Sequence, residues 1–225
     1  MHKPTIGVIL SGCGNRDGAE IHESVFTMLA LDKAGCEMVL MAPDVPQAAV
    51  VNHRTGKTES GTRNVLDESN RIGRGQVKDI KTVDADSLDA VVLPGGFGAA
   101  KNLCDFADKG PACAVNPDVE KLLKAVHSAG KPIGAICIAP ALLARLFGGE
   151  KPTLTIGNDA GTAAALEKCG ARHEDCKIGA VVVDEAGRFV TTPAYMLAPT
   201  LKELASDAEK LVAEVLRLVR KPAAV

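Results

Sequence analysis

The regular alternation of short apolar runs with helical patterns constrains this chain more than any other feature. Residues 5–10, 90–93 and 132–136 are apolar over nearly their whole length, as in strands that are covered on both faces. Each run ends in a turn that contains glycine or proline, and helical patterns separate the runs along the chain. The alternation predicts an α/β fold built on a mostly parallel, doubly wound sheet.

The other expected elements complete this pattern. Helical spacing of apolar residues indicates further helices, at about 19–34, 62–75, 117–130, 140–147 and 199–220, and one that ends near 169. Strands are expected at 37–41 and 154–156, and a hairpin is expected to join 179–183 to 188–190. With 225 residues, 46% of them hydrophobic, and no linker or repeat, we expect a single domain that spans residues 1–225.

Charge and cysteine content argue against several classes of protein. The net charge is -2 and no basic face occurs, so neither nucleic acid nor a membrane surface is an expected partner. No apolar stretch approaches the ~20 residues that a membrane span requires. Seven cysteines without a C-x-x-C motif argue against a disulfide framework and a structural zinc site. Because no targeting segment is recognisable before the first strand, these free thiols predict a protein of the reducing cytoplasm.

Residues 134–141 (GAICIAPA) carry the strongest signal of chemistry. The apolar run ends at Cys137, and Pro140 suits a first helical turn because its missing N–H costs nothing there. Cys137 therefore lies where a strand turns sharply into a helix, the position of the nucleophile in a G-x-S-x-G elbow. The helix N-terminus is expected to favour thiolate over thiol. The alternative is that Cys137 is a small buried core residue, which is common for free cysteine.

Three segments leave strands at one edge of the expected sheet: 11–20, 94–98 and 137–140. In open parallel sheets this edge holds the ligand crevice. Gly95 and Gly96 can present main-chain amides without side chains in the way, and the amide of Ile138 follows the thiol. These three amides are therefore a predicted oxyanion hole facing Cys137. The alternative is a glycine turn that only lets the following helix pack closely.

Acidic and imidazole side chains near the same edge are the candidate partners of the thiol. Glu20 and Glu23 lie in the first turns of the first helix, and Glu23 is the better candidate for a protonated carboxyl that donates a hydrogen bond to sulfur. Acidic residues there otherwise only offset the helix dipole. Cys13, His22 and His53 are second-tier candidates for substrate binding. The two histidines are ranked lower because most single histidines are surface residues or core residues whose hydrogen bonds are made within the protein.

The glycine-rich loop after the first strand allows a competing interpretation as a dinucleotide site. Gly12, Gly14 and Gly18 have the spacing G-x-G-x-x-x-G, and Asp44 after the second strand is a candidate for binding a ribose. The charged Arg16 inside the loop and the cysteine elbow argue against this interpretation. We therefore expect neither a cofactor nor a metal.

The chain also resembles a known family in six motifs. They are residues 9–14 (ILSGCG), 17–23 (DGAEIHE), 51–53 (VNH), 93–102 (LPGGFGAAKN), 136–140 (ICIAP) and 191–196 (TTPAYM). These motifs resemble the ElbB group, the glyoxalase or enhancing-lycopene-biosynthesis proteins of the PfpI and Parkinson-disease deglycase superfamily. That superfamily shares its fold with class I glutamine amidotransferases, and the resemblance covers nearly the whole chain.

This resemblance implies a flavodoxin-like three-layer α/β sandwich, a nucleophilic Cys137 and an acidic partner at Glu23. It also implies a homodimer, an association with isoprenoid metabolism, and weak cofactor-free glyoxalase activity that converts glyoxal to glycolate, with protein deglycase activity as a further expectation. One departure matters. PfpI-type members have a histidine directly after the cysteine, and here Ile138 stands there. This argues against glutaminase and protease activity and favours aldehyde chemistry.

The expected mechanism starts with addition of the Cys137 thiolate to one carbonyl of a small aldehyde or dicarbonyl. Glu23 then shuttles a proton through an enediol, and a thioester is hydrolysed; an unchanged rate on changing Glu23 would move that role to Glu20 or His22. Two alternatives remain at this point: a glutaminase-like amidotransferase subunit, and a non-catalytic thiol sensor in which Cys137 is oxidised by peroxide.

Overall fold

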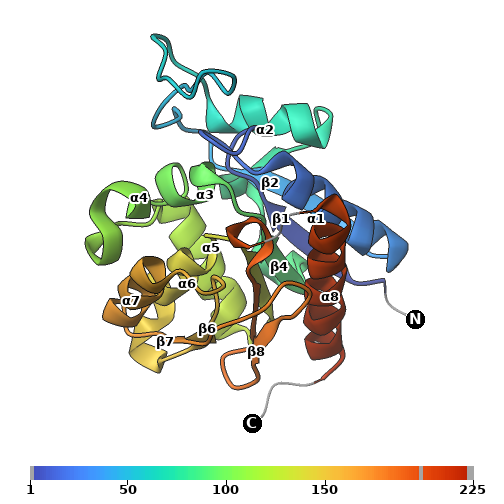
Figure 1. Ribbon diagram of the computed structural model, residues 1–225. Coiled ribbons are helices and arrows are strands. Elements are labelled where there is room, and N and C mark those ends of the chain that lie inside the picture. The colour runs from blue at the N-terminus through green and yellow to red at the C-terminus, as the bar shows by residue number, and fades with distance from the viewer. Residues whose placement is uncertain (1–2, 198–199, 222–225) are drawn as a thin grey trace.

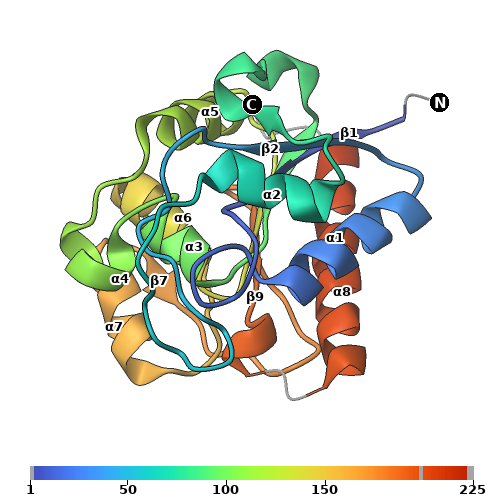
Figure 2. The same ribbon diagram turned by 90° about the horizontal axis from the view of Figure 1, so that it is seen from above.

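The computed structural model describes residues 3–197 and 200–221, and its centre is a seven-stranded sheet (Figures 1 and 2). The strand order is β3-β2-β1-β4-β5-β9-β8, and every neighbouring pair is parallel except β8 and β9. The strands are β1 (Thr5–Ile9), β2 (Glu37–Ala42), β3 (Lys78–Asp79), β4 (Ala90–Leu93), β5 (Ile133–Ile136), β8 (Val182–Asp184) and β9 (Phe189–Thr192). A separate two-stranded sheet pairs β6 (Thr153–Leu154) with β7 (Arg172–His173).

Helices cover both faces of the sheet, so the architecture is the expected three-layer, flavodoxin-like α/β sandwich (Figure 1). One face carries α1 (Ile21–Lys33), α2 (Val65–Gly73) and α8 (Leu201–Arg220), with α1 and α8 side by side. The other carries α3 (Phe97–Lys101), α4 (Phe106–Lys109), α5 (Pro117–Ser128), α6 (Pro140–Phe147) and α7 (Ala160–Lys168). Within the described residues, no helix is long and apolar enough to cross a membrane.

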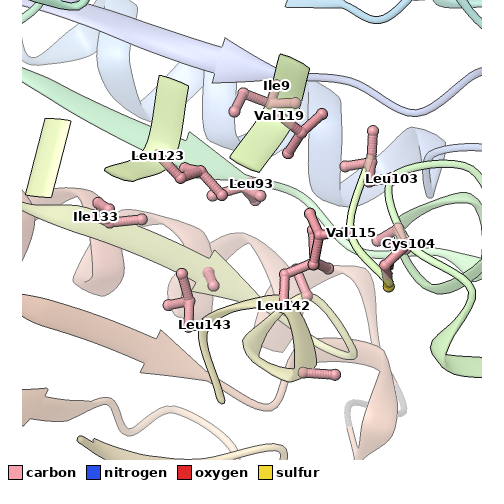
Figure 3. Close-up of a cluster of buried hydrophobic side chains, with 14 of the residues drawn as sticks. Ile9, Leu93, Leu103, Cys104, Val115, Val119, Leu123, Ile133, Leu142 and Leu143 are labelled. Carbon is pink, nitrogen blue, oxygen red and sulfur yellow. Dashed lines mark hydrogen bonds between the residues drawn. The ribbon is translucent and has the colours of Figure 1, made fainter. Parts of the chain in front are cut away.

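The two faces of the sheet explain why the strand sequences are apolar without alternation. On β4, Val91 and Leu93 enter the cluster that contains Leu123 of α5, which Figure 3 shows in close-up. Val92 enters the opposite cluster, which contains Leu211 of α8. All of these side chains are 0% exposed, so successive residues of one strand are buried on opposite faces.

The predicted elements differ from the structure mainly at short segments. The strand expected at 154–156 is Thr153–Leu154, and it pairs with β7 outside the main sheet. The helix expected at 62–75 is Val65–Gly73, because Asn64 accepts the amides of Leu66 and Asp67 as its N-cap. The short elements β3, α3, α4 and β7 were not predicted, since their few residues show no periodicity. The predicted helix start at 199 lies outside the described residues.

Candidate active site

Four strand ends build the candidate site. The loops that follow β1, β4, β5 and β9 meet at the carboxyl edge of the sheet, where ligands bind in open parallel sheets. Main-chain hydrogen bonds join them: the amide of Glu20 donates to the carbonyl of Gly95 at 3.0 Å, and that of Cys137 donates to the carbonyl of Thr192 at 2.9 Å. The expected convergence of 11–20, 94–98 and 137–140 is therefore present, and the loop after β9 joins it.

Cys137 lies on a strained turn between β5 and α6. Its φ is 63°, which lies in the left-handed region that non-glycine residues rarely adopt. Holding a non-glycine residue in this conformation costs of order 1–3 kcal/mol of folding free energy. Ala139 caps α6 and Pro140 is its first residue, as the proline position predicted. The turn brings the thiol to the wall of a cavity of about 780 Å³, with 7% of the residue exposed. The sharp bend aims a nucleophile-type side chain at this cavity.

Glu23 packs behind the thiol and is itself 0% exposed. Its Oε2 accepts the amide hydrogen of Gly95 at 2.8 Å, its Oε1 accepts that of Tyr195 at 3.2 Å, and the carboxyl is hydrogen-bonded to the Cys137 side chain. A Cβ at Gly95 would lie 2.7 Å from Glu23 Oε2 and 2.5 Å from Cys137 Cβ. Glycine at this position is thus what allows the acid and the thiol to touch.

The electrostatics of this pair differ from the expectation of a resting thiolate. Burial, followed by the repulsion of Glu20, raises the pKa of Glu23 to about 8. Burial, followed by the charge of Glu23, raises the pKa of Cys137 well above its ordinary value, although the amides of Gly96 and Ile138 oppose this. The prediction from the helix dipole is therefore wrong for the resting site, because desolvation and a neighbouring acid outweigh one helix end. The pair holds its protons at neutral pH.

Two of the three amides predicted as an oxyanion hole face the sulfur. The N–H groups of Gly96 and Ile138 are hydrogen-bonded to the Cys137 side chain. That of Gly95 is committed to Glu23, so the structure does not offer it to an oxyanion. Gly96 has a φ of 92°, and a Cβ there would lie 2.4 Å from the amide nitrogen of Glu20. Only glycine lets this turn approach the loop after β1 so closely.

Glu20 is the N-cap of α1 and also lines the cavity. Its Oε2 accepts the amide hydrogen of Glu23 at 2.7 Å, and its Oε1 lies 3.8 Å from His22 Nδ1. Glu20 acts on Glu23 through its charge, whereas the carboxyl that is hydrogen-bonded to the thiol is that of Glu23. Of the two candidate acids, the structure brings Glu23 to Cys137.

His22 and Tyr195 form a hydrogen-bonded pair on the cavity wall. His22 Nδ1 lies 2.7 Å from the Tyr195 hydroxyl oxygen, and both residues line the cavity. Burial, followed by the charges of Glu20 and Glu23, raises the pKa of Tyr195. Sequence reasoning did not name Tyr195 as a site residue. The signal was its place directly after a strand, at the edge where parallel sheets bind ligands.

Cys13 and His53 lie outside the cavity. The charges around the Cys13 sulfur include Glu68 and Arg71 of α2, and burial raises the pKa of this thiol. His53 Nε2 accepts the amide hydrogen of Arg16 at 3.3 Å, so this histidine supports the loop after β1 from its outer side. The structure therefore separates these two second-tier candidates from Cys137 and keeps His22 near it.

The loop at 12–18 folds against its own chain, which argues against a dinucleotide site. The amide of Gly98 donates to the carbonyl of Gly18 at 2.9 Å, and a Cβ at Gly98 would lie 2.6 Å from Gly18. The first helix begins with an acidic cap, Glu20, which repels phosphate. Asp44 accepts a hydrogen bond from Asn64. Among the described residues, no three His, Cys, Asp or Glu side chains are arranged to hold a metal ion.

The rest of the cavity wall is mostly apolar. Phe97, Phe106, Ile138 and Met196 line it together with Ala100 and Ala107, and Asn15 and Thr162 add polar groups. Phe97 is 53% exposed, so its ring remains accessible to a ligand in the cavity. A cavity of this size and character is typical of small-molecule sites.

Comparison with known proteins places this geometry in a family. The DJ-1/PfpI family profile matches residues 14–203. The chain belongs to the DJ-1/PfpI family. The ElbB resemblance of the motifs is consistent with this assignment. The human "Glutamine amidotransferase-like class 1 domain-containing protein 3, mitochondrial" is 42% identical over 96% of this chain and 84% of its own length.

Solved structures agree with the family assignment. An isoprenoid biosynthesis protein with an amidotransferase-like domain from Ehrlichia chaffeensis has a TM-score of 0.90 and 33% identity, and covers 96% of this chain and 99% of its own. Glyoxalase III from Candida albicans has a TM-score of 0.60 and 17% identity, covering 94% and 97% of the two chains, so this likeness shows the fold alone.

The relatives overturn one expectation. The human, rat and zebrafish relatives are all named mitochondrial, so the predicted cytoplasmic location is wrong for this group and their names point to mitochondria. The physical reason is that free cysteines report only an environment that keeps thiols reduced. All seven cysteines of the chain are free, and this feature does not distinguish one reducing compartment from another.

Proposed function

We propose that this protein is a cofactor-free glyoxalase that acts on small dicarbonyls, converting glyoxal to glycolate through Cys137. The observation that carries the proposal is the arrangement around one sulfur atom. Cys137 lies at the cavity wall, the amides of Gly96 and Ile138 are directed at its sulfur, and Glu23 contacts it from behind. A nucleophile, a partner that shares its proton and preorganised amides are the parts that carbonyl addition needs.

The first step joins the sulfur to the substrate. The Glu23–Cys137 pair gives up one proton, because attack requires the thiolate and the remaining proton then stays on the carboxyl. The sulfur forms a bond to one carbonyl carbon of glyoxal, and the π electrons move to that oxygen, which takes up a proton. The amides of Gly96 and Ile138 stabilise the negative charge as it develops, and the product is a hemithioacetal.

The second stage moves hydrogen between the two carbons. The hemithioacetal carbon loses its proton, an enediol forms, and the other carbon gains a proton, which leaves a thioester of glycolate on Cys137. Water then cleaves the thioester and releases glycolate and the thiol. The sum is glyoxal plus water to glycolic acid, so neither an oxidant nor a reductant takes part.

The test is a glyoxal turnover assay on the purified chain, with glycolate measured as product. Cys137→Ser should abolish turnover while the circular dichroism spectrum stays unchanged, and Cys169→Ser, at a half-buried thiol away from the cavity, should keep it. Full activity of Cys137→Ser would remove the assigned nucleophile. Longer 2-oxoaldehydes belong in the same assay, because a cavity of about 780 Å³ is large for glyoxal.

The same preparation separates the two alternative functions. Ammonia release from glutamine would favour an amidotransferase-type glutaminase. Conversion of Cys137 to a sulfenic or sulfinic acid by mild peroxide, read from the intact mass, would favour a thiol sensor if glyoxal turnover is absent.

A homodimer is the proposed assembly, and the exposed face of α1 is the surface that supports it. Ile21, Val25 and Leu29 repeat every four residues along this helix and are 42%, 44% and 43% exposed. Members of the DJ-1/PfpI family are often homodimers. A second copy of the chain covering this stripe would remove its apolar surface from water.

A further inference from the structure

The cavity holds a second acid–base pair that the chemistry at Cys137 does not use. His22 and Tyr195 come from α1 and from the loop after β9, more than 170 residues apart, and are joined by the 2.7 Å contact between Nδ1 and the hydroxyl oxygen. Tyr195 also donates its main-chain N–H to Glu23. One residue thus connects the buried acid to a histidine whose side chain is 51% exposed at the cavity.

The surroundings of His22 select one tautomer of its ring. Glu20 Oε1 lies 3.8 Å from Nδ1, and a carboxylate favours a proton on the nearer ring nitrogen. Nδ1–H then donates to the Tyr195 oxygen, which leaves the tyrosine proton free for another acceptor. Nε2 carries a lone pair, and within residues 3–197 and 200–221 it has no hydrogen-bond partner. A base and an acid therefore lie next to each other on the cavity wall.

The two carboxyl groups are less well placed to take a proton from carbon. Glu23 is fully buried behind the sulfur, its two oxygens each accept a main-chain amide, and its pKa of about 8 keeps it protonated at neutral pH. Glu20 has one oxygen bound to the helix end. Among the described cavity residues, Glu20 Oε1 and His22 Nε2 are basic atoms without a hydrogen-bond partner, and His22 is the one whose ring is joined to a hydroxyl that can serve as the acid.

We propose that the His22–Tyr195 pair, and not Glu23, moves the carbon-bound proton of the substrate. This inference rests on the proposed function, because it concerns the hemithioacetal formed at Cys137.

Protons pass through the His22–Tyr195 pair twice, first in one direction to form the enediol and then in the opposite direction to form the thioester. Nε2 removes the proton from the hemithioacetal carbon, the C–H electrons form the carbon–carbon double bond, and the second carbonyl oxygen takes the Tyr195 proton. Tyr195 recovers a proton from Nδ1, so His22 ends as the other neutral tautomer. The return step delivers the Nε2 proton to the second carbon, while Tyr195 passes its proton to Nδ1 and accepts the hydroxyl proton of the first carbon. The thioester forms and the pair is restored.

His22→Ala and Tyr195→Phe test this assignment with glyoxal and dideuterated glyoxal. For His22→Ala, kcat should fall about 10²-fold or more. The mass increase of one glyoxal on Cys137 should persist, since adduct formation needs only the sulfur and the amides. The deuterium isotope effect on kcat should increase, and free imidazole in the buffer should restore part of the activity. Tyr195→Phe should lower kcat in the same direction with little change in KM.

Asp32→Ala, at an exposed position on the same helix, is the matched control and should keep wild-type kinetics. A wild-type kcat in His22→Ala would overturn the inference and leave the proposed function intact. Loss of activity that imidazole does not restore, together with loss of the Cys137 adduct, would also overturn it, because it would show a structural role. Absence of Cys137-dependent turnover in the wild-type protein would instead overturn the proposed function itself. Tyr195 is the single tyrosine of the chain, which has no tryptophan. The intrinsic fluorescence of Tyr195 can therefore be used to follow ligand binding independently of turnover.

Discussion

Replacing Glu23 with glutamine should change how the stability of the protein depends on pH. The carboxyl has an ordinary pKa of 4.5 and a pKa of about 8 in the folded protein. Between these values the folded chain binds the proton more tightly than the unfolded chain, so the folded state loses stability as the pH rises. The contribution of this group is complete below about pH 4.5 and is lost progressively up to about pH 8.

The magnitude follows from the same two values. Each pH unit inside the interval removes about 1.4 kcal/mol from the free energy of unfolding, so the step from pH 5 to pH 8 removes a few kcal/mol. Glutamine does not titrate, so Glu23→Gln should lack this loss. The variant carries a constant cost of about 1–3 kcal/mol, because one amide oxygen cannot replace both carboxyl oxygens that accept the N–H groups of Gly95 and Tyr195.

The assay is urea unfolding followed by circular dichroism at several pH values between 5 and 8, for wild type, Glu23→Gln and Glu37→Gln. Glu37 is exposed on β2, so its variant should follow the wild-type curve. At pH 5 the wild-type protein should be more stable than Glu23→Gln by about 1–3 kcal/mol, and it should lose this advantage as the pH rises, so that the two stability curves meet or cross before pH 8. Parallel pH dependences for wild type and Glu23→Gln would refute the argument that the buried carboxyl is held protonated.

Three further outcomes follow from the site and the surface. The value of kcat/KM for glyoxal should rise about tenfold per pH unit up to about pH 8 and then level off, because the Glu23–Cys137 pair must lose one proton before attack; a flat profile in steady-state kinetics would contradict this. Gly95→Ala should abolish activity and destabilise the fold by several kcal/mol in urea unfolding, because the added Cβ would lie 2.5 Å from Cys137 Cβ. A Cβ at Gly149 would meet nothing within 4 Å, so Gly149→Ala should leave both activity and stability unchanged. Val25→Asp should convert the proposed dimer to a monomer in analytical ultracentrifugation, and an unchanged sedimentation coefficient would contradict an interface on α1.

The candidate site could be predicted from the sequence where local rules decide. Cys137 follows an apolar run and precedes a proline that opens a helix, so its place on a strand-to-helix turn is a matter of neighbouring residues. Glu23 was predicted from its place in the first turns of α1. The directions of individual amides were not predictable, because the N–H of Gly95 can meet either an oxyanion or a carboxylate depending on how α1 lies against β4.

Hydrophobic period and turn chemistry are local, so the alternation of strands and helices, the parallel sheet and the chemical types of residue at its carboxyl edge could be read from the residues alone. The protonation of Cys137 and Glu23 and the pairing of His22 with Tyr195 depend on the packed layers. Desolvation and charge act between groups that are distant along the chain. Their strength depends on distances and burial that arise only when the layers have packed.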